Sequence, residues 1–128
     1  MSSEQGRLLI VEDEEDFARF LSRVATDLGY AVHLVLRSPD FEIQLSSWKP
    51  SVVFLDVFMP DRDGLELLGT LQQHAYDGQL VMMSGADPLY LNMAAASAKM
   101  RGLRLAGVLP KPCRKQDVQD LLARIAAG

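Results

Sequence analysis

Five residues with carboxylate, hydroxyl or ammonium side chains stand at the ends of short apolar segments of this sequence. This spacing matters because the carboxyl ends of parallel strands meet at one edge of a sheet, where open α/β folds bind their ligands. If the apolar segments are parallel strands in register, we expect the five side chains to converge. They are Glu12, Asp13, Asp56, Ser84 and Lys111.

Three carboxylates at one site would repel one another and raise each other's pKa. A hard divalent cation removes this conflict, and Mg2+ takes oxygen ligands while it keeps several waters. We therefore predict Mg2+ bound directly by Asp13 and Asp56, with Glu12 acting through a water or from behind the ligands. The hydroxyl of Ser84 and the ammonium of Lys111 would add a hydrogen-bond donor and a compact cation, which suit a phosphoryl group.

The elements that must position these residues alternate along the chain. Segments rich in β-forming residues predict strands over residues 7–11, 31–36, 51–56, 79–84 and 106–110. The segments between them are predicted to be helices: Gly29 is typical of a helix end, and Ser38-Pro39 and Asp87-Pro88 are typical of helix starts. This alternation predicts an α/β fold, in which helices cover both faces of a parallel sheet.

The apolar positions also predict which faces are buried. Residues 52–55 are continuously apolar, as expected of a central strand covered on both sides. Apolar residues at helical spacing predict the core-facing stripes of three helices. These are Phe17, Phe20, Leu21, Val24 and Leu28; then Leu65, Leu68 and Leu71; then Val118, Leu121, Leu122 and Ile125.

The composition fits one globular domain. Apolar residues make up 48% of the 128 residues and charged residues 23%, which is typical of a protein with its own core. No apolar run approaches the roughly 20 residues that cross a bilayer, and the first residues do not resemble a signal peptide. The single cysteine, Cys113, fits a reducing compartment. We expect one cytoplasmic domain over residues 1–128, with a core of about residues 7–126 and no membrane contact.

One segment carries a resemblance to a known family. Residues 55–64, Leu-Asp-Val-Phe-Met-Pro-Asp-Arg-Asp-Gly, resemble the Asp-x-x-Met-Pro-x-x-Asp-Gly signature of bacterial response-regulator receiver domains. The acidic pair Glu12-Asp13, Ser84 and Lys111-Pro112 also stand where that family has them, so the resemblance extends from Arg7 to about residue 126. It implies a doubly wound, flavodoxin-like fold of five parallel strands in the order 2-1-3-4-5, with five helices.

The resemblance also implies roles for these residues in a phosphorylation-activated two-component switch. Asp56 would accept a phosphoryl group from a histidine kinase or a phosphotransfer protein. The backbone carbonyl of Phe58 would join Asp13 and Asp56 on Mg2+. Lys111, fixed by a cis bond to Pro112, would pair with the phosphoryl oxygens, and the Ser84 hydroxyl would move to contact them.

Three positions depart from the pattern of that family. Val108 stands where an aromatic residue usually swings inward, so the usual coupling to an output surface is in doubt. Phe58 and Ala86 are apolar where polar residues can orient a water, which predicts slow self-dephosphorylation. We expect Cys113 to be a small packed side chain, and His33 and His74 to be structural or surface residues.

The sequence leaves two alternatives to a phosphorylated switch. A phosphate-independent pseudo-receiver that only binds a partner is disfavoured by the retained site residues. A phosphatase with an aspartyl-phosphate intermediate would need a general acid two residues after the nucleophile, and Phe58 cannot transfer a proton. The domain is therefore expected to be no enzyme, with chemistry only on itself.

Charge and composition suggest where partners bind. Residues 1–66 hold 13 acidic and 6 basic side chains, whereas residues 99–128 hold 7 basic and 2 acidic ones, which indicates either a partner surface or ordinary solvated faces. We expect an output domain, a partner protein or a second copy of the chain at the fourth to fifth helices, and no nucleic acid. Residues 107–109, Gly-Val-Leu, faintly resemble receivers joined to cyclic-di-GMP phosphodiesterases. The basic residues of this region are Lys99, Arg101, Arg104, Arg114, Lys115 and Arg124.

Overall fold

The computed structural model describes residues 6–59, 62–85 and 88–128, and its main feature is a five-stranded parallel sheet. The strands lie in the order β2-β1-β3-β6-β7, which confirms the expected order 2-1-3-4-5 when the strands of this sheet are counted along the chain. The strands are β1 (Gly6–Val11), β2 (Tyr30–Val35), β3 (Val52–Asp56), β6 (Gln79–Ser84) and β7 (Arg104–Pro110).

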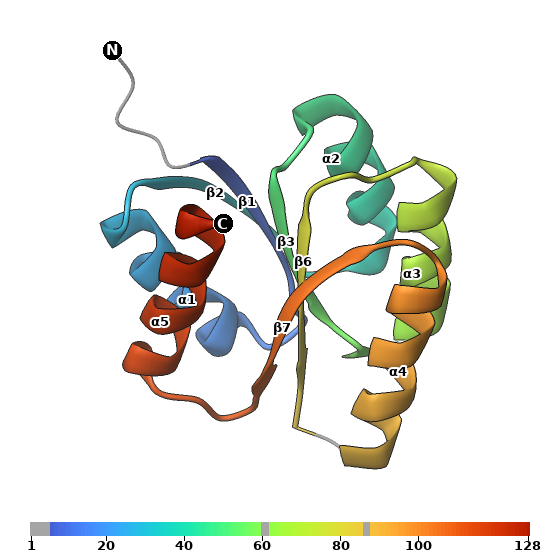
Figure 1. Cartoon of the computed structure of the whole chain (residues 1–128). Coiled ribbons are helices and arrows are strands. Elements are labelled where there is room, and N and C mark those ends of the chain that lie inside the picture. Colours follow the sequence, from blue (N-terminus) through green and yellow to red (C-terminus); the bar gives the residue numbers. More distant parts are fainter. Residues whose placement is uncertain (1–5, 60–61, 86–87) are drawn as a thin grey trace.

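Five α-helices of the described chain cover the two faces of this sheet (Figure 1). Helices α1 and α5 lie side by side on one face, and α2, α3 and α4 cover the other. Both faces of the central strands are therefore shielded from water. The helices are α1 (Glu15–Asp27), α2 (Phe41–Trp48), α3 (Gly64–Gln73), α4 (Pro88–Met100) and α5 (Lys115–Ala127).

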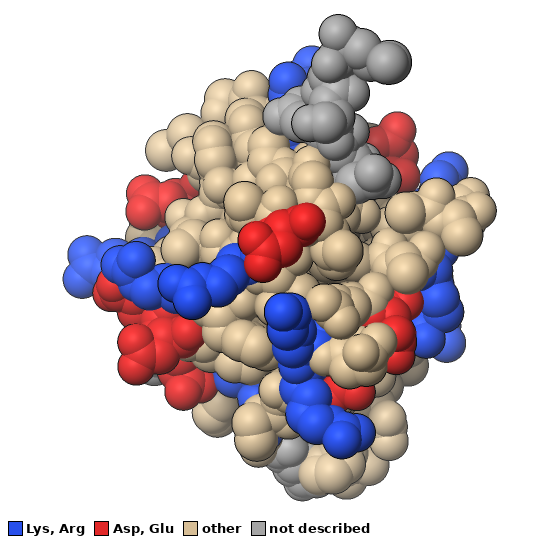
Figure 2. Space-filling view, turned by 90° about the vertical axis from the view of Figure 1, so that its left-hand side faces the viewer, with Lys and Arg blue, Asp and Glu red and all other residues tan. Residues whose placement is uncertain are grey.

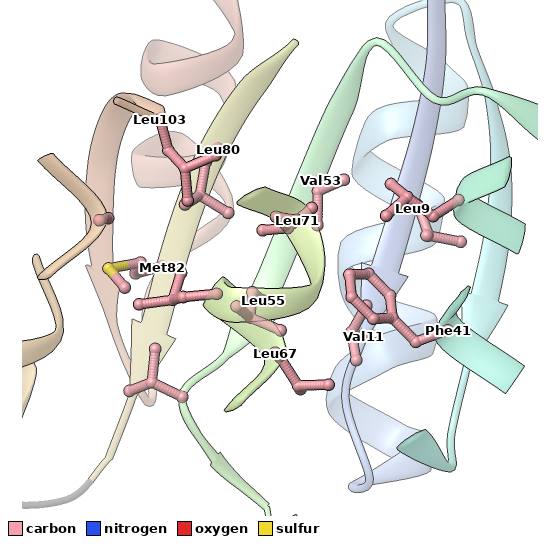
Figure 3. Packing of buried hydrophobic residues seen from close by; sticks show 14 of the residues in the cluster. Leu9, Val11, Phe41, Val53, Leu55, Leu67, Leu71, Leu80, Met82 and Leu103 are labelled. Carbon is pink, nitrogen blue, oxygen red and sulfur yellow. The ribbon is translucent and has the colours of Figure 1, made fainter. Parts of the chain in front are cut away.

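The strands of the sheet divide their side chains between two hydrophobic clusters. Side chains alternate across a strand, so Leu9 and Val11 of β1 pack under α2, α3 and α4, while Leu8 and Ile10 pack under α1 and α5. Strands β3 and β6 divide their residues in the same way, and Figure 3 shows the cluster under α2, α3 and α4. The continuously apolar sequence 52–55 is thus explained by burial on both faces, as predicted.

Helix α1 buries most of its predicted stripe, with Leu21 and Val24 in the core and Phe17 and Phe20 packed against it, but small residues share this face. In α1 the fully buried residues include Ala18 and Ala25, whereas Leu28 from the expected stripe is exposed. In α4 the alanines Ala94 and Ala98 are buried, and Met93 is exposed. Small side chains face the core where a helix lies close to its neighbours, so alanines join the larger apolar residues on the buried face.

The start of α2 was predicted wrongly at Ser38-Pro39. These residues belong to a 3₁₀ turn, Ser38–Asp40, closed by the Asp40 N–H, which donates to the Arg37 carbonyl at 3.2 Å. Asp40 then occupies the position before the α-helix. At the other predicted signals, Gly29 has the positive φ of 99° typical of a helix end, Pro88 begins α4, and Asp87 lies outside the described residues.

Two irregular features of the strands were not predicted. A short antiparallel pair, β4 (Phe58–Met59) and β5 (Arg62–Asp63), follows β3 and leads into α3. In β7 the pairing with β6 shifts register at Ala106, a bulge after which Val108 is 45% exposed. Within the described ranges, the helices are too short and too polar to cross a bilayer.

Candidate functional site

The sheet brings the five predicted site residues to one edge, as the sequence analysis expected. Glu12 and Asp13 follow β1, and Asp56 is the last residue of the neighbouring strand β3. Ser84 ends β6, and Lys111 follows β7. Carboxylate oxygens of Glu12, Asp13 and Asp56 lie within 4.8 Å of one another. The predicted three-carboxylate cluster therefore exists.

Glu12 is the most deeply placed carboxylate of this cluster, with no exposed surface. Its Oε2 accepts hydrogen bonds from the Glu14 backbone N–H and from Lys111 Nζ, each at 3.0 Å. Its Oε1 has no partner among the described residues. Burial raises the pKa of Glu12 to about 7 and the charge of Asp56 adds to this, whereas the two hydrogen bonds oppose it.

Lys111 is the centre of the charge network. Its Nζ donates to Glu14 Oε1 at 2.6 Å, to Glu12 Oε2 at 3.0 Å and to Asp56 Oδ2 at 3.1 Å, and only 11% of its side chain is exposed. The Nζ also lies 5.2 Å from the centre of the Phe17 ring. Burial alone would lower the pKa of Lys111, but its carboxylate partners outweigh that effect and raise the pKa above its usual value.

Asp56 is held by the backbone as well as by Lys111. It is 2% exposed, and its Oδ1 accepts the Phe58 backbone N–H at 2.9 Å. The loop that follows is fixed by Gly64, since a Cβ there would lie 2.4 Å from the Val57 carbonyl oxygen. Only glycine fits this close approach, which explains the glycine at the end of the 55–64 motif.

Ser84 lies beside this cluster at the end of its strand. It is buried, and its backbone carbonyl accepts the Lys111 N–H at 3.1 Å, which ties the loop after β7 to the end of β6. Lys111-Pro112 is a cis peptide, as the resemblance implied. The Ala86 position lies outside the described residues.

A pocket of about 630 Å³ opens over the carboxylates. Phe58 forms one side of its mouth with 64% of its surface exposed, and it contacts Tyr90 of α4 edge-on, with ring centres 6.0 Å apart. An ion or a small anion can therefore reach Asp56 from solvent. The residues that line the pocket are Asp13, Glu14, Phe17, Asp56, Phe58, Gly85, Lys111 and Pro112.

The donor set of this pocket fits a hard divalent cation. Three carboxylates lie within reach of one position, and the buried Glu12 Oε1 lacks a partner in the described chain. Carboxylate oxygens are the ligands that Mg2+ prefers. A cation here would also relieve the repulsion that helps raise the pKa of Glu12.

Three residues of the pocket wall, Glu14, Phe17 and Gly85, were not predicted from the sequence. Glu14 and Phe17 lie at the start of α1, where an acidic run is ordinarily only a favourable helix beginning. No spacing rule marks either as a neighbour of Lys111, which lies 97 residues further along the chain from Glu14. Only the folded arrangement of the β1 and β7 ends reveals the contact.

The remaining singled-out side chains are structural, as expected. His33 stacks on Trp48 with ring centres 3.6 Å apart, and His74 pairs with Glu42 at 2.8 Å. Cys113 is partly buried, and burial raises the pKa of its thiol, so it lacks the thiolate character of a reactive cysteine.

Comparison with known proteins places this geometry in a family. Residues 8–123 match the response regulator receiver domain. The response regulator MprA of Mycolicibacterium vanbaalenii is 30% identical over 123 residues, which are 94% of this chain and 49% of that protein. The transcriptional regulatory protein DltR of Streptococcus agalactiae is 28% identical over 121 residues, 93% of this chain and 50% of that protein. The chain thus spans about half the length of these relatives.

Solved structures have the same fold. A response regulator from Colwellia psychrerythraea superposes with a TM-score of 0.83 at 26% identity and covers 99% of this chain and 100% of its own. A CheY-like receiver domain protein from Methanospirillum hungatei superposes with a TM-score of 0.81 at 18% identity, over 94% of this chain and 93% of its own.

Proposed function

Because the chain belongs to the response regulator receiver domain family, whose members act as phosphorylation-activated switches of two-component systems, we propose that Asp56 is its phosphoacceptor. The single observation that carries this assignment is the contact between Asp56 Oδ2 and Lys111 Nζ at 3.1 Å beneath an open pocket. A buried carboxylate beside a fixed cation suits a nucleophile whose product carries added negative charge.

In the proposed reaction the residues of this chain bind, orient and neutralise. An oxygen of Asp56 attacks phosphorus, and the bond from phosphorus to the nitrogen of a phosphohistidine breaks. Lys111 offers an N–H to the oxygens of the transferred group, and Ser84, at the neighbouring strand end, offers its hydroxyl. The domain therefore changes only itself and is no enzyme toward another substrate.

Mg2+ is the proposed cofactor of this step. Asp13, Asp56 and the backbone carbonyl of Phe58 would hold it directly, with Glu12 behind them. Its chemical contribution would be to neutralise negative charge as the carboxylate and the phosphoryl group approach each other. Among the described residues the buried Oε1 of Glu12 has no partner, which supports an additional polar neighbour at this position.

The test is phosphorylation of the purified chain by acetyl phosphate. We expect one phosphoryl group per chain with Mg2+ and none with a chelator, measured by intact mass. The bond should be cleaved by hydroxylamine, as an acyl phosphate is, and mapping should place it on the peptide that contains Asp56. A chain that takes up no phosphoryl group from acetyl phosphate or phosphoramidate would instead behave as a pseudo-receiver.

The affinity for Mg2+ should depend on pH. Below about pH 7 Glu12 is largely protonated, because burial raises its pKa to about that value, and a protonated carboxyl cannot help neutralise the ion. The affinity should therefore rise several-fold from about pH 6 to pH 8 and then level off. Titration calorimetry of wild type and Glu12→Gln tests this, since the substituted chain should lose most of the rise.

Replacing Asp13 with alanine should weaken Mg2+ binding by at least about 10-fold without unfolding the chain. Asp13 lies at the pocket rim rather than in the core, and its removal relieves repulsion among the carboxylates. Thermal unfolding without metal should therefore show equal or greater stability. An unchanged Mg2+ affinity would remove Asp13 from the ligand set, and Asp16→Ala serves as the control for an exposed carboxylate of α1.

Replacing Phe58 with asparagine should shorten the life of the phosphorylated state by roughly 3- to 10-fold, because an amide can orient an attacking water. Phe58 stands at the mouth of the pocket and is mostly exposed, so the substitution should not unfold the chain. Decay of the label after donor removal is the measurement. Phe58→Leu keeps the position apolar and should decay like wild type; equal decay in all three chains would show that water access does not limit the reaction.

Partners and output are proposed from the surface. A histidine kinase or phosphotransfer protein would deliver the phosphoryl group at the pocket, and Cys113, a lone cysteine, fits the cytoplasm. For output we propose a partner or a second copy of the chain at α4, β7 and α5, where Met93 and Val108 are exposed. The face of α1 and α5 carries interspersed charges of both signs (Figure 2). A cyclic-di-GMP phosphodiesterase output rests only on the resemblance of residues 107–109.

A further inference from the structure

All three N–H bonds of the Lys111 ammonium are used before any phosphoryl group arrives. An ammonium has three donors and no acceptor, and its three acceptors here are carboxylates of Glu12, Glu14 and Asp56. A phosphoryl oxygen can therefore bond to Lys111 only if one of these contacts is given up. How readily Lys111 can bind the phosphoryl group therefore depends on which of the three contacts breaks.

The three carboxylates differ in what their release would cost. Glu12 is fully buried and its other oxygen already lacks a partner in the described chain, so losing Lys111 would leave a buried charge with only the Glu14 backbone N–H as its partner. Asp56 is the proposed nucleophile and stays beside the new group. The Glu14 side chain is 65% exposed, so water can replace Lys111 at its carboxylate.

Phe17 helps to keep Lys111 in place when the contact between Lys111 and Glu14 breaks. The Phe17 ring lies 5.2 Å from Nζ, three residues after Glu14 along the chain, and it offers attraction without using an N–H donor. The Glu12 contact persists on the buried side. Glu12 and Phe17 thus keep the ammonium in place, while the N–H that had bonded to Glu14 forms a hydrogen bond to the incoming phosphoryl oxygen.

We infer that Glu14 competes with the phosphoryl group for Lys111 and thereby limits how readily Asp56 is phosphorylated. This inference rests on the proposed function of Asp56 and extends it to a residue outside the predicted site. Glu14 is a positioning residue, since it acts on the transferred group through Lys111. Its charge also lines the pocket through which an anionic donor must enter, so it disfavours highly charged donors most.

The exchange at Lys111 accompanies a balanced group transfer. With an acyl phosphate, an Asp56 oxygen forms a bond to phosphorus, the bond from phosphorus to the donor's bridging oxygen breaks, and the donor carboxylate leaves with that electron pair. No oxidant or reductant takes part. The ion pair between Lys111 and Glu14 is replaced by one between Lys111 and a phosphoryl oxygen, and Glu14 becomes hydrated.

The experiment compares Glu14→Gln with a matched control, Glu15→Gln. Both substitutions remove one negative charge from the start of α1, but Glu15 pairs with Arg19 on the surface and does not touch Lys111. With Mg2+ present, we expect Glu14→Gln to be phosphorylated roughly 3- to 5-fold faster than wild type, and Glu15→Gln within a factor of about 1.5. The increase should be larger with acetyl phosphate than with the less charged phosphoramidate.

Binding of the phosphoryl mimic trifluoroberyllate gives a readout that is independent of the donor's leaving group. Glu14→Gln should bind the mimic more tightly by a similar factor, whereas a merely structural role would leave this affinity unchanged. Equal acceleration in both substituted chains would show that only net charge matters and would overturn the inference. A slower Glu14→Gln chain would also overturn it, since Glu14 would then assist the reaction. If wild type itself takes up no phosphoryl group, the proposed function fails rather than this inference.

Discussion

Replacing Asp56 with asparagine is expected to abolish phosphorylation, with a fall in rate of at least about 1000-fold. The amide carries no negative charge and is a poor nucleophile toward phosphorus. It can keep the hydrogen bond from the Phe58 N–H, but its NH₂ group would face the Lys111 ammonium as a second donor. The chemistry should therefore be lost while the loop after β3 keeps its shape.

Intact mass after incubation with acetyl phosphate and Mg2+ measures this effect. Asp16→Asn makes the same change on the exposed start of α1 and should be labelled like wild type. Circular dichroism should show that Asp56→Asn is folded, because one wall of the pocket changes and both hydrophobic clusters are untouched. Undiminished labelling of the folded Asp56→Asn chain would place the nucleophile elsewhere.

The convergence of the site could be predicted because it depends on topology. Parallel strands that alternate with helices must end at one edge of the sheet, so the ends at Asp13, Asp56 and Lys111 meet whatever the details of packing. The continuously apolar residues 52–55 likewise predict a central strand, because such a strand is buried on both faces. Both predictions depend only on the spacing of apolar residues and on the order of the strands and helices along the chain, which can be taken directly from the sequence.

The features that could not be predicted depend on distances between side chains. The contact between Glu14 and Lys111 requires the start of α1 to lie beside the loop after β7, and no local pattern encodes that separation. The same holds for α1, where Ala18 and Ala25 are buried beside the predicted Leu21 and Val24, while Leu28 is exposed. At Ser38-Pro39 a helix-start pattern produced a 3₁₀ turn instead, since both conformations suit that pair.

Replacing Lys111 with methionine should separate the function of the site from its stability. The substituted chain should still bind Mg2+, because the carboxylates remain, but it should lose phosphorylation-dependent activation since no fixed cation meets the phosphoryl oxygens. Hydrogen exchange of α4 and β7 with and without trifluoroberyllate measures activation. Changes as large as those of wild type would contradict the role of Lys111.

Stability of the Lys111→Met chain should depend on pH in a direction set by Glu12. Burial already raises the pKa of Glu12 to about 7, and loss of Lys111 removes two influences that lower it, so the pKa should rise further. A carboxyl whose folded pKa is raised contributes stability at low pH and loses it as pH rises through that value. We expect little destabilisation near pH 5 and about 2–3 kcal/mol near pH 8, where the buried carboxylate lacks its partner.

The double substitution Glu12→Gln with Lys111→Met is the control that separates the effect of Lys111 on stability from its effect on activation. The neutral amide removes one of the two buried charges that Lys111 had balanced, the other being that of Asp56, so urea unfolding at pH 8 should recover about half of the lost stability and the dependence on pH should flatten. Activation should not return, because the phosphoryl group still lacks its cation. If the double substitution restored activation, Lys111 would act only by balancing Glu12; if it left the pH 8 stability unrecovered, the loss would come from the unpaired Asp56 carboxylate or from packing around the Lys111 side chain instead.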